Sequence, residues 1–186
     1  MKKILGVVGS PRKNGNTHIL VDKILEGAVS AGAQSDIVLL GPLDIKECNG
    51  CHACGPGKDC TKRDDMNPLY PRIAESDVIV LGTPIYWYGP TALMKCFLDR
   101  FVYFNNPGNR PQVRGMKAIL AIPFEEDNPE IASLTVDMFA KSLDYLEMEL
   151  AGTIIVPGAG AKGDVLGMAD KLGEAFEVGR EVASLT

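Results

Sequence analysis

Several features that would place the chain in a common functional class are missing from the sequence. Its 186 residues contain no apolar run of membrane-spanning length and no block of Lys and Arg. The net charge of −5 is spread along the chain, without the basic footprint of a nucleic-acid or anionic-membrane binder. The apolar segment 3–8 is too short for a signal peptide and is soon broken by Pro11. We therefore expect a cytoplasmic protein with no nucleic-acid or membrane partner.

Cysteine is nearly absent outside one short segment. Four of the five cysteines lie between residues 48 and 60, and the fifth is Cys96. In a reducing compartment, clustered cysteines bind metal or carry redox chemistry more often than they form structural disulfides. With 46% hydrophobic residues, a chain of this length can bury a sizeable core. We expect one domain over residues 1–186, with a cysteine-rich loop at 44–66.

Short apolar segments alternate along the chain with longer segments of helical periodicity. Strands are expected at residues 3–8, 35–40, 78–82, 117–122 and 153–156, and helices at 17–31, 67–74, 91–101, 129–149 and 168–183. Several of these strands are apolar throughout, as strands covered on both faces should be. The alternation predicts an α/β fold, a three-layer sandwich around a doubly wound parallel sheet.

The first strand is followed by a loop of small and polar residues, Gly9 to Thr17, and then at once by a helical pattern. Such a loop places free backbone N–H groups and the positive end of a helix dipole at one point, which favours a bound phosphate. Ser10, Asn16 and Thr17 can add hydrogen bonds there. Arg12 can add positive charge. The loop has neither the dinucleotide fingerprint nor the Gly-Lys-Ser/Thr of a P-loop. It favours a monophosphate, with a simple helix-capping turn as the alternative.

A second unusual loop, Gly82 to Pro90, follows the third strand and carries three adjacent aromatic residues. In open α/β sheets, ligands bind beyond the carboxyl ends of the strands where the strand order reverses; FMN in flavodoxin is the established example. The aromatic residues could therefore form the wall of a site for a planar ring. Alternatively, they pack a helix N-terminus or a subunit interface.

These motifs together carry a family resemblance. The segments Ser10-Pro-Arg-x-x-Gly-Asn-Thr17, Cys48-x-Gly-Cys51 running on to Asp64-Asp-Met66, and Gly82-Thr-Pro-Ile-Tyr-Trp87 with Lys95 to Arg100 resemble the NADPH-dependent FMN reductase family of the flavodoxin-like superfamily. Within that family the chain is most similar to the iron-sulfur flavoproteins. The resemblance covers nearly the whole chain.

The resemblance implies a flavodoxin-like sandwich with five parallel strands in the order 2-1-3-4-5, and FMN as the cofactor. It implies that the phosphate is bound by Ser10, Arg12, Asn16 and Thr17, and that the ring lies beside Pro84, Ile85, Tyr86, Trp87 and Gly89. Family members commonly complete the ring site with the loop after the fourth strand. Here that loop, 123–128, is acidic and lacks the expected glycines.

The four clustered cysteines follow the spacing Cys48-x2-Cys51-x2-Cys54-x5-Cys60. Four thiolates in a short, glycine-containing loop suit either a [4Fe–4S] cluster or a structural zinc ion. The last spacing is longer than in bacterial ferredoxins but resembles the compact motif of iron-sulfur flavoproteins. A [4Fe–4S] cluster is expected, with free or redox-active thiols, zinc and disulfides as alternatives.

Together these features predict an FMN-dependent oxidoreductase, an iron-sulfur flavoprotein that transfers electrons through bound FMN. The chemistry would take place on the flavin, so no catalytic side chain is expected. NAD(P)H or a ferredoxin would supply the electrons. One alternative is an NAD(P)H-dependent FMN or quinone reductase without a cluster. An alternative of another class is a zinc-stabilised, non-enzymatic binding module.

Aromatic residues in loops also predict self-association. A monomer has little need to expose so many of them, and aromatic residues are enriched at protein interfaces. The residues concerned are Tyr86, Trp87, Tyr88, Tyr103 and Phe104. We expect a homodimer or homotetramer that uses the aromatic loop and the segment 103–115. The family resemblance implies a dimer or tetramer with the flavin near subunit interfaces.

Overall fold

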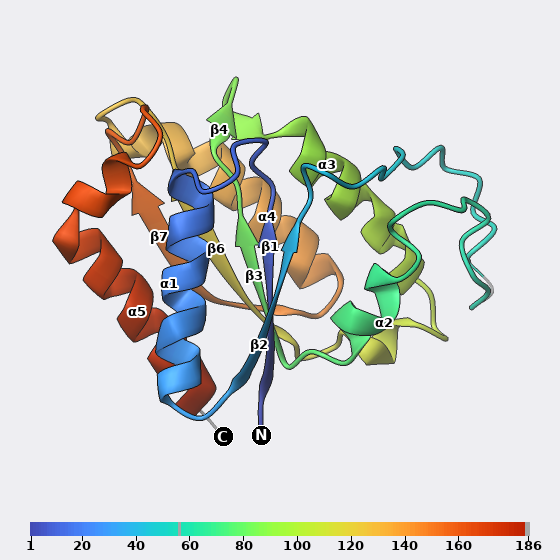
Figure 1. Cartoon of the computed structure of the whole chain (residues 1–186). Helices are drawn as coiled ribbons and strands as arrows, with labels where there is room; N and C mark the ends of the chain where they lie inside the picture. Colours follow the sequence, from blue (N-terminus) through green and yellow to red (C-terminus); the bar gives the residue numbers. More distant parts are fainter. Residues whose placement is uncertain (56, 185–186) are drawn as a thin grey trace.

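The computed structural model describes residues 1–55 and 57–184. Residues 56 and 185–186 belong to the expected domain, and residue 56 to the cysteine-rich loop, but they lie outside the described residues. A five-stranded parallel sheet forms the centre, in the order β2-β1-β3-β6-β7 (Figure 1). This is the predicted order 2-1-3-4-5. The strands are β1 (Lys3–Val8), β2 (Gln34–Leu39), β3 (Val78–Gly82), β6 (Lys117–Pro123) and β7 (Glu149–Val156).

Helices cover both faces of the sheet (Figure 1). One face carries α1 (Asn16–Ser30) and α5 (Ala169–Ser184), and the other carries α2 (Leu69–Ala74), α3 (Ala92–Asp99) and α4 (Ser133–Tyr145). Each face has its own hydrophobic core, because alternate residues of a strand point to opposite sides. In β1, Ile4 and Val8 pack on the α1 side, whereas Leu5 and Val7 pack on the other. Burial on both sides explains why this strand is apolar throughout.

The chain between Pro129 and Glu149 differs from the single helix that its periodicity predicts. A short 3₁₀-helix, η3 (Pro129–Ala132), precedes α4, which ends at Tyr145. Glu147 then has a φ of 61°, a left-handed conformation through which a right-handed helix cannot continue. The chain turns at this point and enters β7 at Glu149, so this strand is longer than predicted.

The aromatic residues expected to be exposed after α3 are part of the core instead. The chain continues from α3 into two 3₁₀-helices, η1 (Arg100–Phe104) and η2 (Arg110–Gln112). Phe104 is fully buried, and the ring of Tyr103 stacks on that of Tyr70 with centroids 4.0 Å apart. The expected exposure is therefore wrong for Phe104, which is buried against Tyr70 of α2, whereas Tyr103 is half-buried and an interface role for it stays a prediction.

Residues 44–66 form a long connection between β2 and α2, with no helix or strand among those that are described. Figure 1 shows this segment beside α2 and α3, projecting away from α1 and α5. None of the described helices is long and apolar enough to cross a membrane.

Candidate functional site

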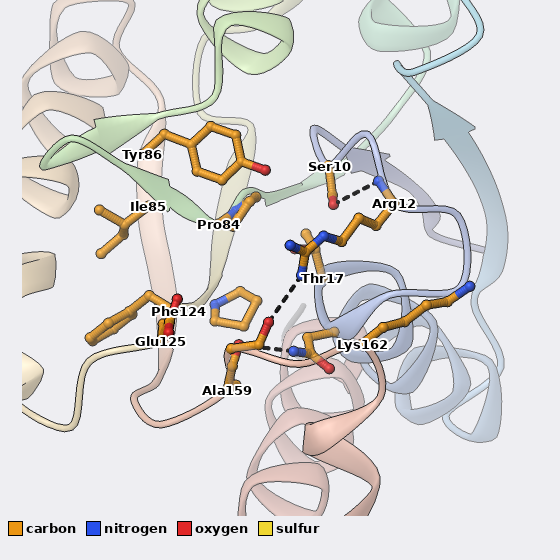
Figure 2. Close-up of a pocket in the computed structure, with 13 residues that line it drawn as sticks. Ser10, Arg12, Thr17, Pro84, Ile85, Tyr86, Phe124, Glu125, Ala159 and Lys162 are labelled. Carbon is orange, nitrogen blue, oxygen red and sulfur yellow. Dashed lines mark hydrogen bonds between the residues drawn. The ribbon is translucent and has the colours of Figure 1, made fainter.

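Most of the predicted site residues meet in one pocket at the carboxyl ends of β1, β3, β6 and β7 (Figure 2). Its volume of about 100 Å³ is below the roughly 300–1,000 Å³ of a pocket that encloses a whole small molecule. A larger ligand would therefore be enclosed in part and extend over the open edge. The lining residues are Ser10, Arg12, Asn16, Thr17, Pro84, Ile85, Tyr86, Pro123, Phe124, Glu125, Ala159, Gly160 and Lys162.

One end of the pocket is polar and electropositive. Helix α1 begins here at Asn16, its N-cap residue Gly15 offers no side-chain acceptor, and its first turn contains no acidic residue. The first N–H groups and the positive end of the helix dipole are therefore not neutralised by a carboxylate of the same turn. Ser10 and Thr17 are buried beside them, at 8% and 2% exposure. This end of the pocket is suited to a phosphate group.

Arg12 comes from the same loop but reaches across the pocket. Figure 2 shows its side chain between Ser10 and Ala159. Its Nη1 atom donates a hydrogen bond of 2.9 Å to the carbonyl oxygen of Gly160. A guanidinium has five N–H donors, so others remain for an acceptor bound in the pocket. Arg12 can therefore bind an anion without losing its contact with Gly160.

Asn16 also lines the pocket, but its side-chain amide is already fully engaged. Nδ2 donates to the carbonyl oxygens of Ala159 at 2.9 Å and Ala161 at 2.8 Å. Oδ1 accepts from the N–H of Gly163 at 2.8 Å and from that of Val165 at 3.4 Å. These four bonds use both amide hydrogens and both lone pairs of the oxygen. All four partners lie after β7, far from Asn16 in the sequence.

The other end of the pocket is apolar. Pro84 and Ile85 line it from the loop after β3, and Phe124, only 3% exposed, lines it from the loop after β6. Figure 2 shows Tyr86 above Pro84, on the same side of the pocket. The loop 123–128 therefore contributes to the wall although it lacks the glycines expected from the resemblance.

Two predicted ring contacts, Trp87 and Gly89, do not line the pocket. They belong to a small antiparallel hairpin that the sequence did not predict, formed by β4 (Ile85–Tyr86) and β5 (Gly89–Pro90). Trp87, at the tip, is 97% exposed. Trp87 and Tyr88 have φ angles of 51° and 63°, as in a type I′ turn, which favours Asn and Gly and is strained for bulky residues. Strain of this kind often accompanies a functional contact.

Buried threonines hold the loops after β1 and β3 together beneath the pocket. The Thr91 hydroxyl accepts from the N–H of Met94 at 3.2 Å, which caps α3, and donates to the carbonyl oxygen of Gly9. The Thr83 hydroxyl accepts from the N–H of Thr91 at 3.1 Å. The N-terminal end of α3 is thus fixed beside the pocket.

The loop after β7 is the part of the pocket that sequence reasoning missed. The sequence did contain a signal for a binding loop here, because residues 158–163 have the spacing Gly-x-Gly-x-x-Gly and lie between a strand and a helix. Lys162 lines the pocket from this loop, although Figure 2 shows its side chain extending away from Tyr86 and Phe124. The loop is not a free phosphate cradle, because four of its N–H groups donate to acceptors within the protein. These are the N–H groups of Gly158, Ala159, Ala161 and Gly163.

The clustered cysteines line a separate cavity of about 20 Å³. It lies beside Arg100, beyond the C-terminal end of α3, whereas the first pocket lies near the N-terminal end of that helix. Four thiols around one cavity have the number and chemistry of a [4Fe–4S] ligand set. Within the described residues, however, no three His, Cys, Asp or Glu side chains converge closely enough to hold a metal ion. The loop would therefore have to rearrange to hold a cluster. The four thiols are those of Cys48, Cys51, Cys54 and Cys60.

The thiols of this loop lie in unequal environments. Cys51 is exposed, and hydrogen bonds from the backbone of Ala53 and the side chain of Thr61 lower its pKa. Cys54 is buried, and its burial raises its pKa. Since the thiolate is the form that binds metal, Cys51 reaches the metal-binding form more readily than Cys54 does.

Arg100 lies on the inner side of the cysteine cavity and is only 1% exposed. Nη1 donates to Asp64 Oδ2 at 2.6 Å and to the carbonyl oxygen of Lys46 at 2.9 Å, and Nη2 donates to Cys60 Sγ at 3.3 Å. Burial raises the pKa of Asp64, but hydrogen bonds from Arg100 and from the backbone of Lys46 and Met66 outweigh it, so the pKa lies below its ordinary value. This buried ion pair attaches the cysteine-rich loop to the end of α3.

Comparison with known proteins agrees with this geometry. Residues 2–123 match the family model of NADPH-dependent FMN reductase. Two iron-sulfur flavoproteins from Archaeoglobus fulgidus are similar to the chain. One is 36% identical over 113 residues, which is 61% of this chain and 50% of that protein. The other is 30% identical over 165 residues, which is 89% of this chain and 81% of that protein. The chain thus spans about half the length of the first relative and most of the second.

The fold has counterparts among solved structures. The Trp repressor binding protein from Bacillus subtilis superposes with a TM-score of 0.70 at 23% identity, over 95% of this chain and 98% of that one. This likeness and the strand order confirm the flavodoxin-like fold. The family match confirms the resemblance that the phosphate loop and the aromatic loop carry. The chain therefore belongs to the NADPH-dependent FMN reductase family.

Proposed function

We propose that the chain binds FMN in the pocket of Figure 2 and transfers electrons from NAD(P)H through it. The observation that carries the proposal is the polarity of the pocket, which has an uncapped helix N-terminus at one end and apolar side chains at the other. FMN has a phosphate at one end and a flat ring at the other. When bound, its ring supplies the redox chemistry by accepting a hydride from NAD(P)H and passing the electrons to an acceptor.

The residues of the chain would bind and orient the cofactor. The hydroxyls of Ser10 and Thr17 and the guanidinium of Arg12 would donate hydrogen bonds to the phosphate, together with the first N–H groups of α1. Pro84 and Phe124 would cover the ring and keep water from it. Tyr86 stays half-exposed, which leaves a solvent-facing side through which NAD(P)H could approach.

Removing two phosphate donors should weaken FMN binding while sparing riboflavin, which lacks the phosphate. Charge-assisted hydrogen bonds contribute roughly 1.5–3 kcal/mol each. We therefore expect the double variant Arg12→Ala with Thr17→Val to lose at least about tenfold in FMN affinity, measured by quenching of flavin fluorescence, at nearly constant riboflavin affinity. Lys13→Ala is the control, because it removes an exposed charge from the same loop. An equal loss for both flavins would show that this loop does not bind the phosphate.

We also propose that Cys48, Cys51, Cys54 and Cys60 bind a [4Fe–4S] cluster, with a ferredoxin as an electron donor. All four thiols line one cavity, and the described residues of the loop that carries them form no helix or strand that would resist a rearrangement. Relatives named iron-sulfur flavoproteins support the same assignment. Without a cluster, the chain would be a plain NAD(P)H-dependent flavin or quinone reductase.

Self-association through the tip of the aromatic hairpin is a further part of the proposal. Tyr86, Trp87 and Tyr88 are all exposed, and Leu134 is exposed at the start of α4. Helix α4 lies against the hairpin, because the Thr135 hydroxyl donates to the carbonyl oxygen of Tyr88 at 3.0 Å. These side chains form an apolar surface beside the pocket, and aromatic residues are common at the centre of interfaces.

Replacing the strained turn should separate the subunits without harming the fold. In the variant Trp87→Asn with Tyr88→Gly, the introduced Asn and Gly both favour the type I′ turn. The hairpin should therefore form at least as well as in the wild type. Loss of a buried interface Trp typically costs about 2 kcal/mol or more, so the dissociation constant from sedimentation should rise at least about tenfold. The control is Val29→Asn. Val29 is also an exposed apolar residue, but it lies near the C-terminal end of α1, whereas the pocket lies at the N-terminal end of that helix. A wild-type protein that is monomeric at micromolar concentration with FMN bound would contradict the proposal.

A further inference from the structure

We propose that Asn16 is a positioning residue that holds the loop after β7 against the pocket and does not itself bind the phosphate. This inference rests on the FMN site proposed above. Asn16 is only 8% exposed, and its side-chain amide makes four hydrogen bonds, all to residues 159–165. To bind a phosphate, Nδ2 would have to give up one of these two carbonyl oxygens. The carbonyl oxygen of buried Ala159 would then lose the donor it has in Asn16, whereas that of exposed Ala161 also accepts from the N–H of Asp164 at 3.3 Å.

The loop that Asn16 holds also contacts the apolar end of the pocket. The N–H of Ala159 donates to the carbonyl oxygen of Phe124 at 2.7 Å, and that of Gly158 donates to the carbonyl oxygen of Glu126 at 2.9 Å. Gly160 packs closely against Glu125, because a Cβ atom added to Gly160 would lie only 2.8 Å from Cγ of Glu125. The loop is therefore a wall shared by both ends of the pocket, and a shift at Asn16 would be transmitted to the ring end.

Arg12 makes a second link between the phosphate loop and this wall. Its Nη1 donates to the carbonyl oxygen of Gly160, the residue after Ala159, whose own carbonyl accepts from Asn16. The position of the wall thus sets where one edge of the guanidinium lies. Asn16 would act on the phosphate through Arg12 and on the ring through Phe124, without touching either part of the cofactor.

The test compares FMN with riboflavin in Asn16→Ala. A lost phosphate ligand would weaken FMN alone, as expected for Arg12 and Thr17. A displaced wall would weaken both flavins by a similar factor, which we expect to be about tenfold, and would change the visible circular dichroism of the bound ring. Hydrogen exchange on flavin-free protein should also speed up at the amides of Gly163 and Val165, whose acceptor is removed. Asn14→Gly, in the same loop with a φ of 54°, is the control that should change none of these.

A second variant disturbs the same contacts in another way. Asn16→Asp keeps the acceptor for Gly163 and Val165 but turns a carboxylate oxygen toward the carbonyl oxygens of Ala159 and Ala161. Because these oxygens repel one another, it should weaken riboflavin binding at least as much as Asn16→Ala does, and slow exchange at the amides of β1 and β3 in both variants would show that the fold is intact. Unchanged riboflavin affinity in both variants, or unchanged exchange in residues 158–165, would overturn the inference. If wild-type protein binds neither flavin, the proposed function fails instead, and the exchange measurement still decides whether Asn16 holds the loop.

Discussion

Arg100→Met is expected to lower the free energy of unfolding by about 3–5 kcal/mol, the range measured when one partner of a buried ion pair is removed. The variant leaves the Asp64 carboxylate buried without its cation, and the Lys46 carbonyl oxygen and the Cys60 sulfur without a donor. Met occupies much of the same apolar volume, so the loss is mainly electrostatic. Urea denaturation of reduced, cluster-free protein would measure it.

Arg114→Met is the matched control for this substitution. Arg114 also forms an ion pair, with Nε 2.7 Å from Glu147 Oε2, but the two side chains are 57% and 45% exposed. Exposed pairs contribute about 0–1 kcal/mol, so this variant should be nearly as stable as the wild type. Combining Arg100→Met with Asp64→Asn should restore part of the lost stability, because no unpaired charge remains and the amide oxygen can still accept from a backbone N–H group. If Arg100→Met costs no more than Arg114→Met, the buried pair does not hold the cysteine-rich loop.

The same pair predicts a change in pH dependence. The pKa of Asp64 is lower in the folded protein than the ordinary 3.8, so the unfolded state binds more protons and stability falls as the pH falls through the folded pKa. In Arg100→Met, burial without the cation should raise the pKa instead, and protonation would then favour the folded state. The stability difference between the two proteins should therefore shrink as the pH is lowered from about 6 to about 3.

Cys51→Ser should remove the iron from the protein completely. Anaerobically reconstituted wild type should contain about four irons and four sulfides per chain if the cluster proposal is correct. Ser replaces the thiolate with a much weaker ligand, and because Cys51 is exposed the substitution should cost little stability. FMN binding should persist, since the cysteine cavity and the FMN pocket lie near opposite ends of α3. Iron, sulfide and flavin assays on the same samples would measure all three.

Cys96→Ser is the control for the iron assay. Cys96 is a half-buried residue of α3 outside the cysteine cavity, so its variant should keep the iron. Wild-type protein that carries stoichiometric FMN but no iron after anaerobic reconstitution would contradict the cluster and favour a plain flavin reductase. Full iron content in Cys51→Ser would show that the ligand set has been misassigned.

Much of the fold could be predicted from the sequence because its strongest signals are local. β1 and β3 occur at Lys3–Val8 and Val78–Gly82 as predicted, since strands buried on both faces are short apolar runs bounded by polar or glycine residues. The proposed phosphate loop was recognisable for a similar reason: Ser10 and Arg12 lie between β1 and α1, and Thr17 lies in the first turn of that helix. The boundary at Glu147 was not predicted, because a left-handed residue at a helix end leaves no periodicity to detect.

By itself, then, the sequence determined the alternation of strands and helices, the family, and which loops carry polar, aromatic or cysteine side chains. Only the tertiary structure decided what those side chains contact. Asn16 bonds to residues 143 to 149 positions away, and Arg100 to a carboxylate 36 positions away. Buried polar groups must find partners, but the partner is set by which loops the sheet brings to the same edge. That depends on strand order and on how helices pack on both faces, and these are properties of the whole chain.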